Sequence, residues 1–143
     1  MRILIKSFTV IMLSVFSIMT YAEQKEVKGN WDIHYIAFPA TFLEPEVAKN
    51  YGLIRSKYKG VVNISILAND NKMKAQNAFV SGTAKNLLGQ SQKMSFKKVQ
   101  EGDAIYFLAQ MDYHNEEIFN FKVEVQQGDR VESIKFSKKF YVD

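Results

Sequence analysis

The segment FNFKVEVQQGDRVESIKFS, residues 119–137, contains the clearest structural pattern in this 143-residue chain. Apolar side chains occupy positions 119, 121, 123 and 125, and polar side chains separate them, as in a strand with one buried face. Ile134 and Phe136 repeat the alternation after Gln127-Gly128-Asp129, which is a turn signal. The segment therefore predicts an antiparallel hairpin with one apolar face.

The same alternation extends over most of the chain. Further strands are predicted at residues 26–38, 61–67, 78–88, 94–99 and 104–111. The last of these is apolar on both faces, which favours a position inside a sheet.

One segment breaks this pattern and predicts a helix. Residues 44–52 place Pro45 near a helix start and Gly52 at its end, so a helix of two turns is expected. About seven strands and one short helix predict an all-β fold, an immunoglobulin-like antiparallel β-sandwich.

The first 22 residues have the composition of a secretory signal peptide. Arg2 and Lys6 give a basic start, an apolar stretch follows, and Thr20-Tyr21-Ala22 supplies the small residues that precede a cleavage site. The apolar stretch has about 12 residues, well short of the roughly 20 that span a bilayer. The sequence therefore predicts a signal peptide at residues 1–22 and one β-sandwich domain at residues 23–143, with no stable membrane insertion after cleavage.

Composition excludes several classes of function. Loss of Arg2 and Lys6 with the signal lowers the formal net charge from +4 to +2, too mild a basicity for a dedicated nucleic-acid binder. The chain has no cysteine, which excludes a thiol nucleophile, a Cys-ligated metal site, a redox pair and a lipidated cysteine. No cofactor is predicted, and the sequence assigns no oligomeric state.

The residues that carry catalysis are scarce in this chain. It lacks the Gly-x-Ser-x-Gly, His-Glu-x-x-His and Ser-x-x-Lys motifs of common hydrolases. His34 is expected to be a partly buried, hydrogen-bonded ring in the first strand, and His114 to lie in a solvated turn rich in acids. These features favour a non-catalytic protein and assign no metal ligand, while a hydrolase or metal-binding protein that uses His34 or His114 is kept as the alternative.

An irregular segment, residues 34–59, is the candidate binding surface. Irregular segments on a rigid β scaffold are where binding residues gather, and an arginine fork suits a carboxylate or phosphate. The candidate residues of this segment are His34, Tyr35, Phe38, Phe42, Tyr51, Arg55 and Lys57. The partner expected here is a periplasmic protein or an anionic small ligand.

A purely structural interpretation of the segment is also open. In that interpretation Phe38, Phe42 and Leu43 cap one end of the sandwich, while Arg55 and the lysines after it form a solvated strand edge that discourages edge pairing. Exchange of an edge strand with a partner, as in pilus chaperones, is a third and weaker possibility.

The same segment also carries a family resemblance. The runs HYIAFPATFLEPEVA (34–48), YGLIRSK (51–57) and NIS (63–65) resemble a family of small exported gammaproteobacterial proteins, domain of unknown function 4426. The resemblance covers essentially the whole mature chain. It implies a non-lipidated, single-domain protein in the periplasm of a Gram-negative bacterium, and it brings no catalytic residue. Together these features predict a periplasmic, non-catalytic binding or protein-interaction module.

Overall fold

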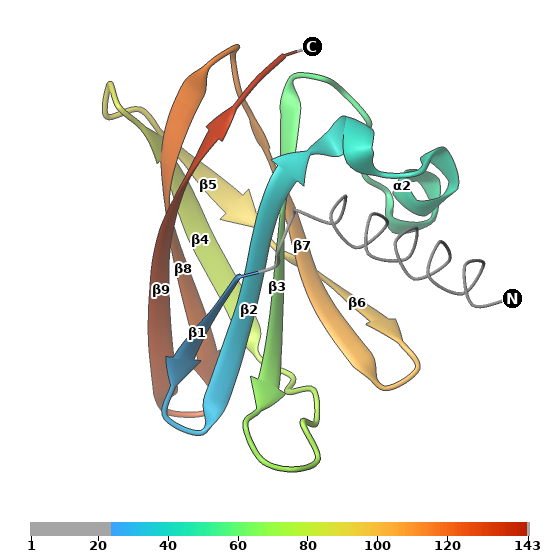
Figure 1. Cartoon of the computed structure of the whole chain (residues 1–143), viewed down its shortest axis with the longest axis vertical. Helices are drawn as coiled ribbons and strands as arrows, with labels where there is room; N and C mark the ends of the chain where they lie inside the picture. The colour runs from blue at the N-terminus through green and yellow to red at the C-terminus, as the bar shows by residue number, and fades with distance from the viewer. Residues whose placement is uncertain (1–23, 143) are drawn as a thin grey trace, which may run out of the picture.

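The computed structural model describes residues 24–142, which form two layers of β-sheet with one short helix beside them (Figure 1). The predicted signal peptide lies outside the described residues. In chain order the elements are β1 (Gln24–Lys28), β2 (Trp31–Pro39), the 3-10 helix η1 (Ala40–Phe42), α2 (Pro45–Tyr51), β3 (Lys59–Ala68), β4 (Phe79–Asn86), β5 (Ser91–Ser95), β6 (Lys97–Glu101), β7 (Ala104–Asp112), β8 (Glu117–Gln127) and β9 (Arg130–Phe140).

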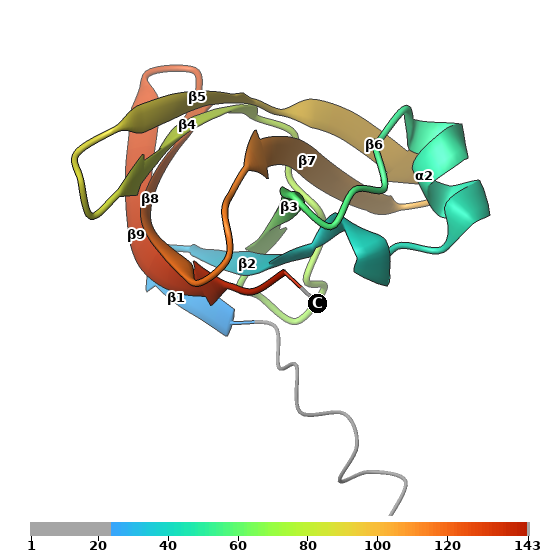
Figure 2. The same cartoon turned by 90° about the horizontal axis from the view of Figure 1, so that it is seen from above.

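The strand order confirms the immunoglobulin-like sandwich. One sheet has the order β1-β2-β3-β7-β6 and the other the order β5-β4-β8-β9, and every pair is antiparallel. Without β1 and β5, these orders match the ABED and CFG sheets of an immunoglobulin domain. The view from above in Figure 2 shows the two sheets facing each other. As predicted, β7 lies inside its sheet, between β3 and β6.

The described residues form nine strands where about seven were predicted, because two predicted strands are divided. Residues 26–38 do not form one strand. They divide between β1 and β2 at Gly29, whose positive φ of 58° makes the tight turn that a glycine allows. Residues 94–99 also divide, because the chain leaves the four-stranded sheet after β5 and enters the five-stranded sheet as β6.

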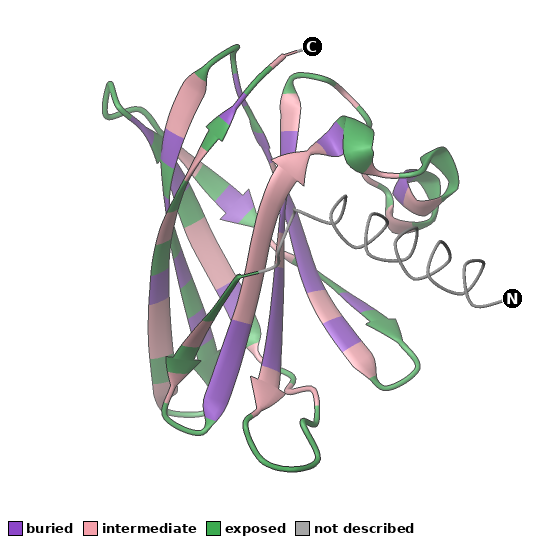
Figure 3. Ribbon diagram, viewed as in Figure 1, coloured by how far each residue is buried: buried purple, intermediate pink, exposed green. Residues whose placement is uncertain are grey.

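The main core lies between the two sheets and is rich in aromatic rings. Phe119 and Phe121 on β8, which were predicted to face inward, are each 1% exposed. The Phe121 ring stacks on Phe136 at a centroid distance of 4.9 Å, and Phe136 stacks on Tyr35 of the opposite sheet at 4.5 Å. Figure 3 shows the resulting alternation of buried and exposed positions along the strands. Burial of these rings supplies the driving force for folding in a domain that has no disulfide.

At the end of the sandwich that holds the β1–β2 turn, Arg130 of β9 links the first hairpin to the last strand. Its guanidinium lies 3.6 Å from the ring centroid of Trp31 and donates to the carbonyl oxygen of Lys28 at 2.8 Å and to Oδ1 of Asn30 at 2.6 Å. Trp31 is 2% exposed beneath it. A cation over a buried indole and two charge-assisted hydrogen bonds therefore join the two sheets at this end.

A second, smaller apolar cluster lies on the outer face of the five-stranded sheet. Its buried members are Ala40, Val61, Val99 and Leu108, with Phe38, Leu43, Tyr51, Leu53 and Tyr106 packed against them. The segment of residues 40–58, which includes η1 and α2, supplies the covering side chains. The predicted helix is confirmed: α2 begins at Pro45 and ends at Tyr51, and Gly52 caps it with a left-handed φ of 67°. One outer face of the sandwich is therefore covered.

Candidate functional site

The covering segment, residues 40–58, is held in place by hydrogen bonds at several points. Arg55 Nε donates to the carbonyl oxygen of Leu43 at 2.7 Å, and its Nη2 donates to that of Thr41 at 3.3 Å. These bonds close the segment on itself across α2. Arg55 was predicted to bind a ligand, and these two bonds show that its guanidinium also fastens the covering segment.

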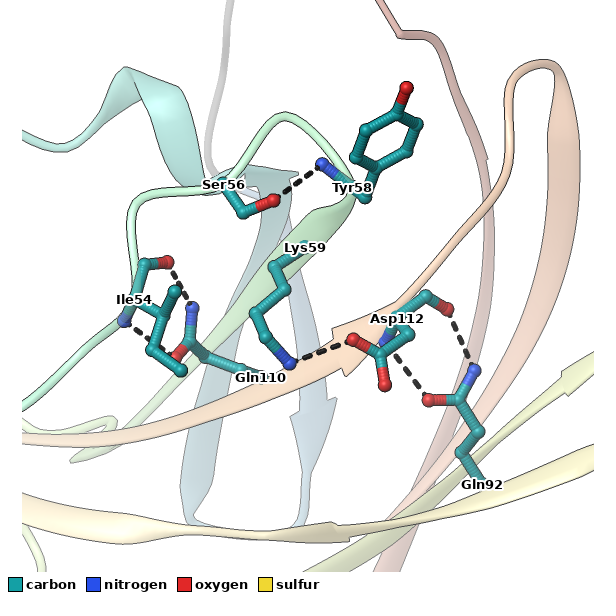
Figure 4. Close-up of polar contacts among 7 residues, drawn as sticks. All are labelled: Ile54, Ser56, Tyr58, Lys59, Gln92, Gln110 and Asp112. Atoms are coloured by element: carbon teal, nitrogen blue, oxygen red, sulfur yellow. Dashed lines mark hydrogen bonds and ion pairs between the residues drawn. The ribbon is translucent and has the colours of Figure 1, made fainter.

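A glutamine of β7 fixes the chain after α2. Figure 4 shows the Gln110 side chain accepting a hydrogen bond from Ile54 N at 2.9 Å and donating one to Ile54 O at 2.8 Å, as a neighbouring strand would. Lys97 Nζ donates to the carbonyl oxygen of Tyr51 at 2.8 Å. The covering segment is thus fastened to β6 and β7 through side chains that bond its backbone.

The start of β3 is also engaged in the sheet. Lys59 Nζ contacts Asp112 Oδ1 at 2.7 Å, and the two residues lie opposite each other on β3 and β7 (Figure 4). β3 lies between β2 and β7. The structural interpretation in which Arg55, Lys57 and Lys59 form a strand edge is therefore wrong, because the first two lie in the covering segment and the third lies on an inner strand.

A pocket of about 200 Å³, the end pocket, opens where the covering segment meets the end of the chain. It is lined by Phe38, Pro39, Thr41, Phe42, Lys57, Tyr113, Lys138, Lys139, Phe140 and Tyr141. Phe38, Phe42 and Lys57 were predicted for the binding surface. Phe42 is 56% exposed, although its ring is stacked with that of Phe38 at 6.5 Å. The end pocket therefore combines exposed aromatic rings with lysine side chains.

The lysines of the end pocket lie beside aromatic rings. Lys57 Nζ is 5.5 Å from the ring centroid of Tyr58, and Lys139 Nζ is 5.2 Å from that of Tyr141. No ion pair within residues 24–142 includes Lys57 or Lys139. A lysine beside an exposed ring and outside any ion pair gives the end pocket positive charge.

The other predicted site residues lie elsewhere. Tyr35 faces the core between the sheets, and Tyr51 packs on the second cluster at the end of α2. Tyr51 lines another hollow, of about 380 Å³, together with Phe38, Leu43, Val47 and five residues of the sheet. The structure thus gathers Phe38, Phe42 and Lys57 at the end pocket, and Phe38 also lines the second hollow with Tyr51.

His34 lies on β2 and is partly buried, as predicted. Its Nε2 is buried and has no partner among the described residues, and the same holds for Oδ1 of Asn63 on the adjoining strand.

The two histidines are far apart. His34 lies opposite Ser65 on β3, whereas His114 follows Asp112, which lies opposite Lys59. Ser65 and Lys59 are about 20 Å apart along β3 at the usual rise per residue. His114 is exposed, in agreement with the predicted turn. Across residues 24–142, no group of three His, Asp or Glu side chains could hold a metal ion.

The residues that the sequence analysis missed come from the end of the chain. Lys138, Lys139 and Tyr141 line the end pocket, and Tyr113 Oη donates a hydrogen bond to the carbonyl oxygen of Tyr141 at 3.2 Å. The run KKFY at 138–141 has the same basic and aromatic composition as residues 55–59. That composition was the available signal, but only the topology shows that the two runs meet.

In the part of the chain that the structure describes, no helix has both the length and the apolar character needed to cross a membrane. α2, with seven residues, is the longest helix among these residues.

Comparison with solved structures places the fold among two groups of proteins. A crystal structure of a DUF4426 family protein from Pseudomonas aeruginosa is 37% identical to this chain, with a TM-score of 0.76, and the match covers 85% of this chain and 96% of the other. A copper-bound variant of FetP from uropathogenic Escherichia coli has 14% identity and a TM-score of 0.59, covering 85% of this chain and 91% of FetP.

A second FetP structure, of protein expressed in the periplasm of E. coli, gives a TM-score of 0.58 at 14% identity, covering 84% and 94% of the two chains. At this identity the likeness to FetP shows a shared fold alone. Among curated proteins, none matches this chain.

The family is established by sequence. The model of the domain of unknown function DUF4426 matches residues 25–143. The match covers nearly all of the chain that follows the predicted signal peptide. It agrees with the resemblance found in residues 34–65 and with the fold shared with the Pseudomonas protein, and the chain therefore belongs to the DUF4426 family.

Proposed function

We propose that the protein is a non-catalytic binding module of the periplasm whose end pocket takes up an anionic ligand. The observation that carries the proposal is the pair of lysines, Lys57 and Lys139, at a small pocket with aromatic walls, neither of them in an ion pair within residues 24–142. The family itself supplies no activity, so the proposal rests on this site.

The chemistry of the walls defines the ligand class. Lysine ammonium groups bind a carboxylate or phosphate as point charges, and the rings of Phe42 and Tyr141 offer apolar faces beside them. A pocket of about 200 Å³ suits a small group rather than a whole polymer. The ligand proposed is therefore a carboxylate or phosphate that is attached to a flat apolar group, either free or at the end of a larger molecule.

The pocket is built from rigid parts, which supports a binding role. Arg55 and Gln110 fasten the covering segment on one side of it, and on the other side Phe140 is 1% exposed and stacked 4.7 Å from Tyr113. Walls that are fixed before the ligand arrives reduce the entropy lost on binding.

The copper in the FetP structure raises the question of a metal in this chain. The alternative of a hydrolase or metal-binding protein requires His34 or His114 with further ligands. The distance between the two histidines and the absence of a three-ligand group in residues 24–142 give this alternative no support. The end pocket is the better-supported site.

Phenyl phosphate tests the proposal, since it has a phosphate on a flat ring and the size of the pocket. In a titration followed by amide chemical shifts, we expect saturable shifts around residues 57 and 139–141. Lys57→Gln and Lys139→Gln should each weaken binding by about fivefold to tenfold, because each removes one charge beside the anion. Lys49→Gln, an exposed lysine on α2, is the matched control and should leave the affinity unchanged.

Two results would count against the proposal. One is equal binding of the neutral analogue benzyl alcohol, which would remove the anionic class. The other is a set of shifts that avoids the end pocket. If crosslinking in intact cells captured a protein through Lys57, and phenyl phosphate did not bind, the small-ligand proposal would give way to a protein partner.

A further inference from the structure

The outer face of the four-stranded sheet carries a row of lysines. Lys93 on β5 lies opposite Thr83 on β4, Thr83 lies opposite Lys122 on β8, and Lys122 lies opposite Lys135 on β9. Adjacent strands are about 4.8 Å apart, and residues directly opposite each other share one face. The row therefore crosses the whole sheet on its solvent side, and its three lysines are all exposed.

Two more lysines extend this lysine face toward the end of the sheet that holds the end pocket. Lys85 is the next outward position after Thr83 on β4, and Lys139 is the second outward position after Lys135 on β9; both are exposed. Glu124 is the acidic residue on this face, at 3.9 Å from Lys122 Nζ. A domain of low net charge thus concentrates five lysines on one outer face.

This arrangement costs stability. Like charges on directly opposite residues of a sheet repel each other, and Lys122 faces Lys135 with no residue between them. Since the fold itself would favour an uncharged or oppositely charged pair, the row is better explained by an extended anionic partner that neutralises several lysines together.

An apolar projection adjoins the lysine face. Leu87 and Leu88 in the connection from β4 to β5 are 70% and 85% exposed, and Figures 1 and 2 show this connection projecting beyond the sheet. Leu87 continues the outward positions of Thr83 and Lys85 along the chain. The two leucines therefore lie at one end of the same surface.

The projecting turn is firmly built. Asn86 is 7% exposed, and its Oδ1 accepts hydrogen bonds from the backbone nitrogens of Leu88 at 3.1 Å and Gln90 at 2.8 Å. Its Nδ2 donates to Glu117 Oε2 at 2.9 Å. A buried, fully engaged asparagine holds the leucines out in water, where their exposure is unfavourable unless another apolar phase receives them.

We propose that this lysine face and the Leu87-Leu88 projection dock on a membrane surface rich in anionic phospholipid. The leucines enter the boundary between headgroups and acyl chains, and the lysines contact lipid phosphates, with their apolar stems lying along the interface. Charge complementarity and the adjoining apolar projection both favour this occupant. An acidic protein surface would match the lysines but leave the projecting leucines unexplained.

Vesicle co-sedimentation tests this docking, with protein expressed from the full sequence and recovered from the cell envelope, so that every variant shares one N-terminus. The wild-type protein should sediment with phosphatidylglycerol vesicles and not with phosphatidylcholine vesicles, and added salt should release it. Lys122→Gln with Lys135→Gln should weaken binding roughly tenfold or more. Leu87→Ser with Leu88→Ser should weaken it by at least about fivefold.

The matched control is Lys72→Gln with Lys98→Gln, which removes the same charge from exposed positions elsewhere. This variant should retain binding within about twofold. Equal binding to both kinds of vesicle, or a control as weak as the Lys122 and Lys135 variant, would overturn the proposal. Failure of the wild-type protein to bind vesicles, with capture of an acidic protein through the lysine face, would replace the membrane by a protein partner.

The docking surface shares Lys139 with the end pocket, but residues that belong to only one of the two sites test them apart. Lys57→Gln lies outside the lysine face and should leave vesicle binding unchanged while it weakens phenyl phosphate binding. Each proposal can therefore fail while the other stands.

Discussion

The two outer faces of this sandwich differ in the polarity of their side chains and in what covers them. On the five-stranded sheet, outward positions such as Val61 and Leu108 are apolar, and the covering segment buries them. On the four-stranded sheet, outward positions such as Thr83 and Lys122 are polar, and the face stays exposed. Because strand alternation marks only one face of a strand as buried, what lies over the other face depends on segments that fold back from elsewhere.

The largest expected difference between the faces is in packing energy. Leu108→Ala should lower the free energy of unfolding by about 2–4 kcal/mol, because it opens a cavity beneath the covering segment. Thr83→Ala at an outward position of the exposed face should change it by less than about 0.5 kcal/mol. Urea denaturation measures both. Equal effects would mean that the covering segment adds no packing of its own.

The attachment of the covering segment gives the next effect. Arg55→Gln removes the bonds to Leu43 and Thr41 and should cost about 1–2 kcal/mol, since two carbonyl groups lose a charged donor. Amide hydrogen exchange should become faster in residues 41–55 and stay unchanged in β8. Lys57→Gln, in the same segment, is the control and should leave both patterns intact. Uniformly faster exchange would show that Arg55 supports the whole fold instead.

A smaller effect is expected at the end of α2. Gly52→Ala should cost about 1 kcal/mol, because alanine is disfavoured at a φ of 67°. Its added methyl group would also approach Lys97 Nζ, which bonds the carbonyl oxygen of Tyr51. Thermal unfolding with Gly102→Ala as a comparison separates the two causes, because Gly102 has a similar φ of 58° and open space around it. Equal losses would assign the whole cost to the backbone.

The smallest effect has the opposite sign and belongs to the exposed face. Lys122→Gln should stabilise the fold by up to about 0.5 kcal/mol at low salt, because it relieves the repulsion from Lys135. The gain should disappear at high salt, where exposed charges are screened. Glu124→Gln should act in the other direction by removing the acid beside Lys122. A gain in stability that does not depend on salt would show that the strand propensity of glutamine, and not relief of charge repulsion, causes the effect.

The sequence predicted the strands whose inner face is apolar along its length. Residues 61–67, 104–111 and 119–125 all lie in strands, and the alternation placed Phe119 and Phe121 correctly in the core. The prediction of one strand at residues 94–99 was wrong, because the chain passes from one sheet to the other between β5 and β6 without a turn sequence that marks the change. Local patterns report which face is buried, but they do not report which sheet a strand joins.

The lining of the end pocket was predicted in part for a similar reason. Its exposed ring and lysine, Phe42 and Lys57, line the end pocket as a basic and aromatic composition suggested. The sequence did not reveal that Arg55 bonds two backbone carbonyl groups, because their position depends on how the chain turns around α2. Lys139 and Tyr141 were missed because the chain end reaches the pocket only through the pairing of β8 with β9.

The contact between Arg130 and the first hairpin has a consequence for the order in which the protein acquires its structure. The hydrogen bond to Lys28 joins residues 102 positions apart, so it cannot form until nearly the whole chain has been synthesised and released. Until then the β1–β2 hairpin lacks its contacts with Arg130 of β9. Trp31 is the one tryptophan of the chain and lies directly beneath Arg130. Its fluorescence can therefore report when this contact forms during folding.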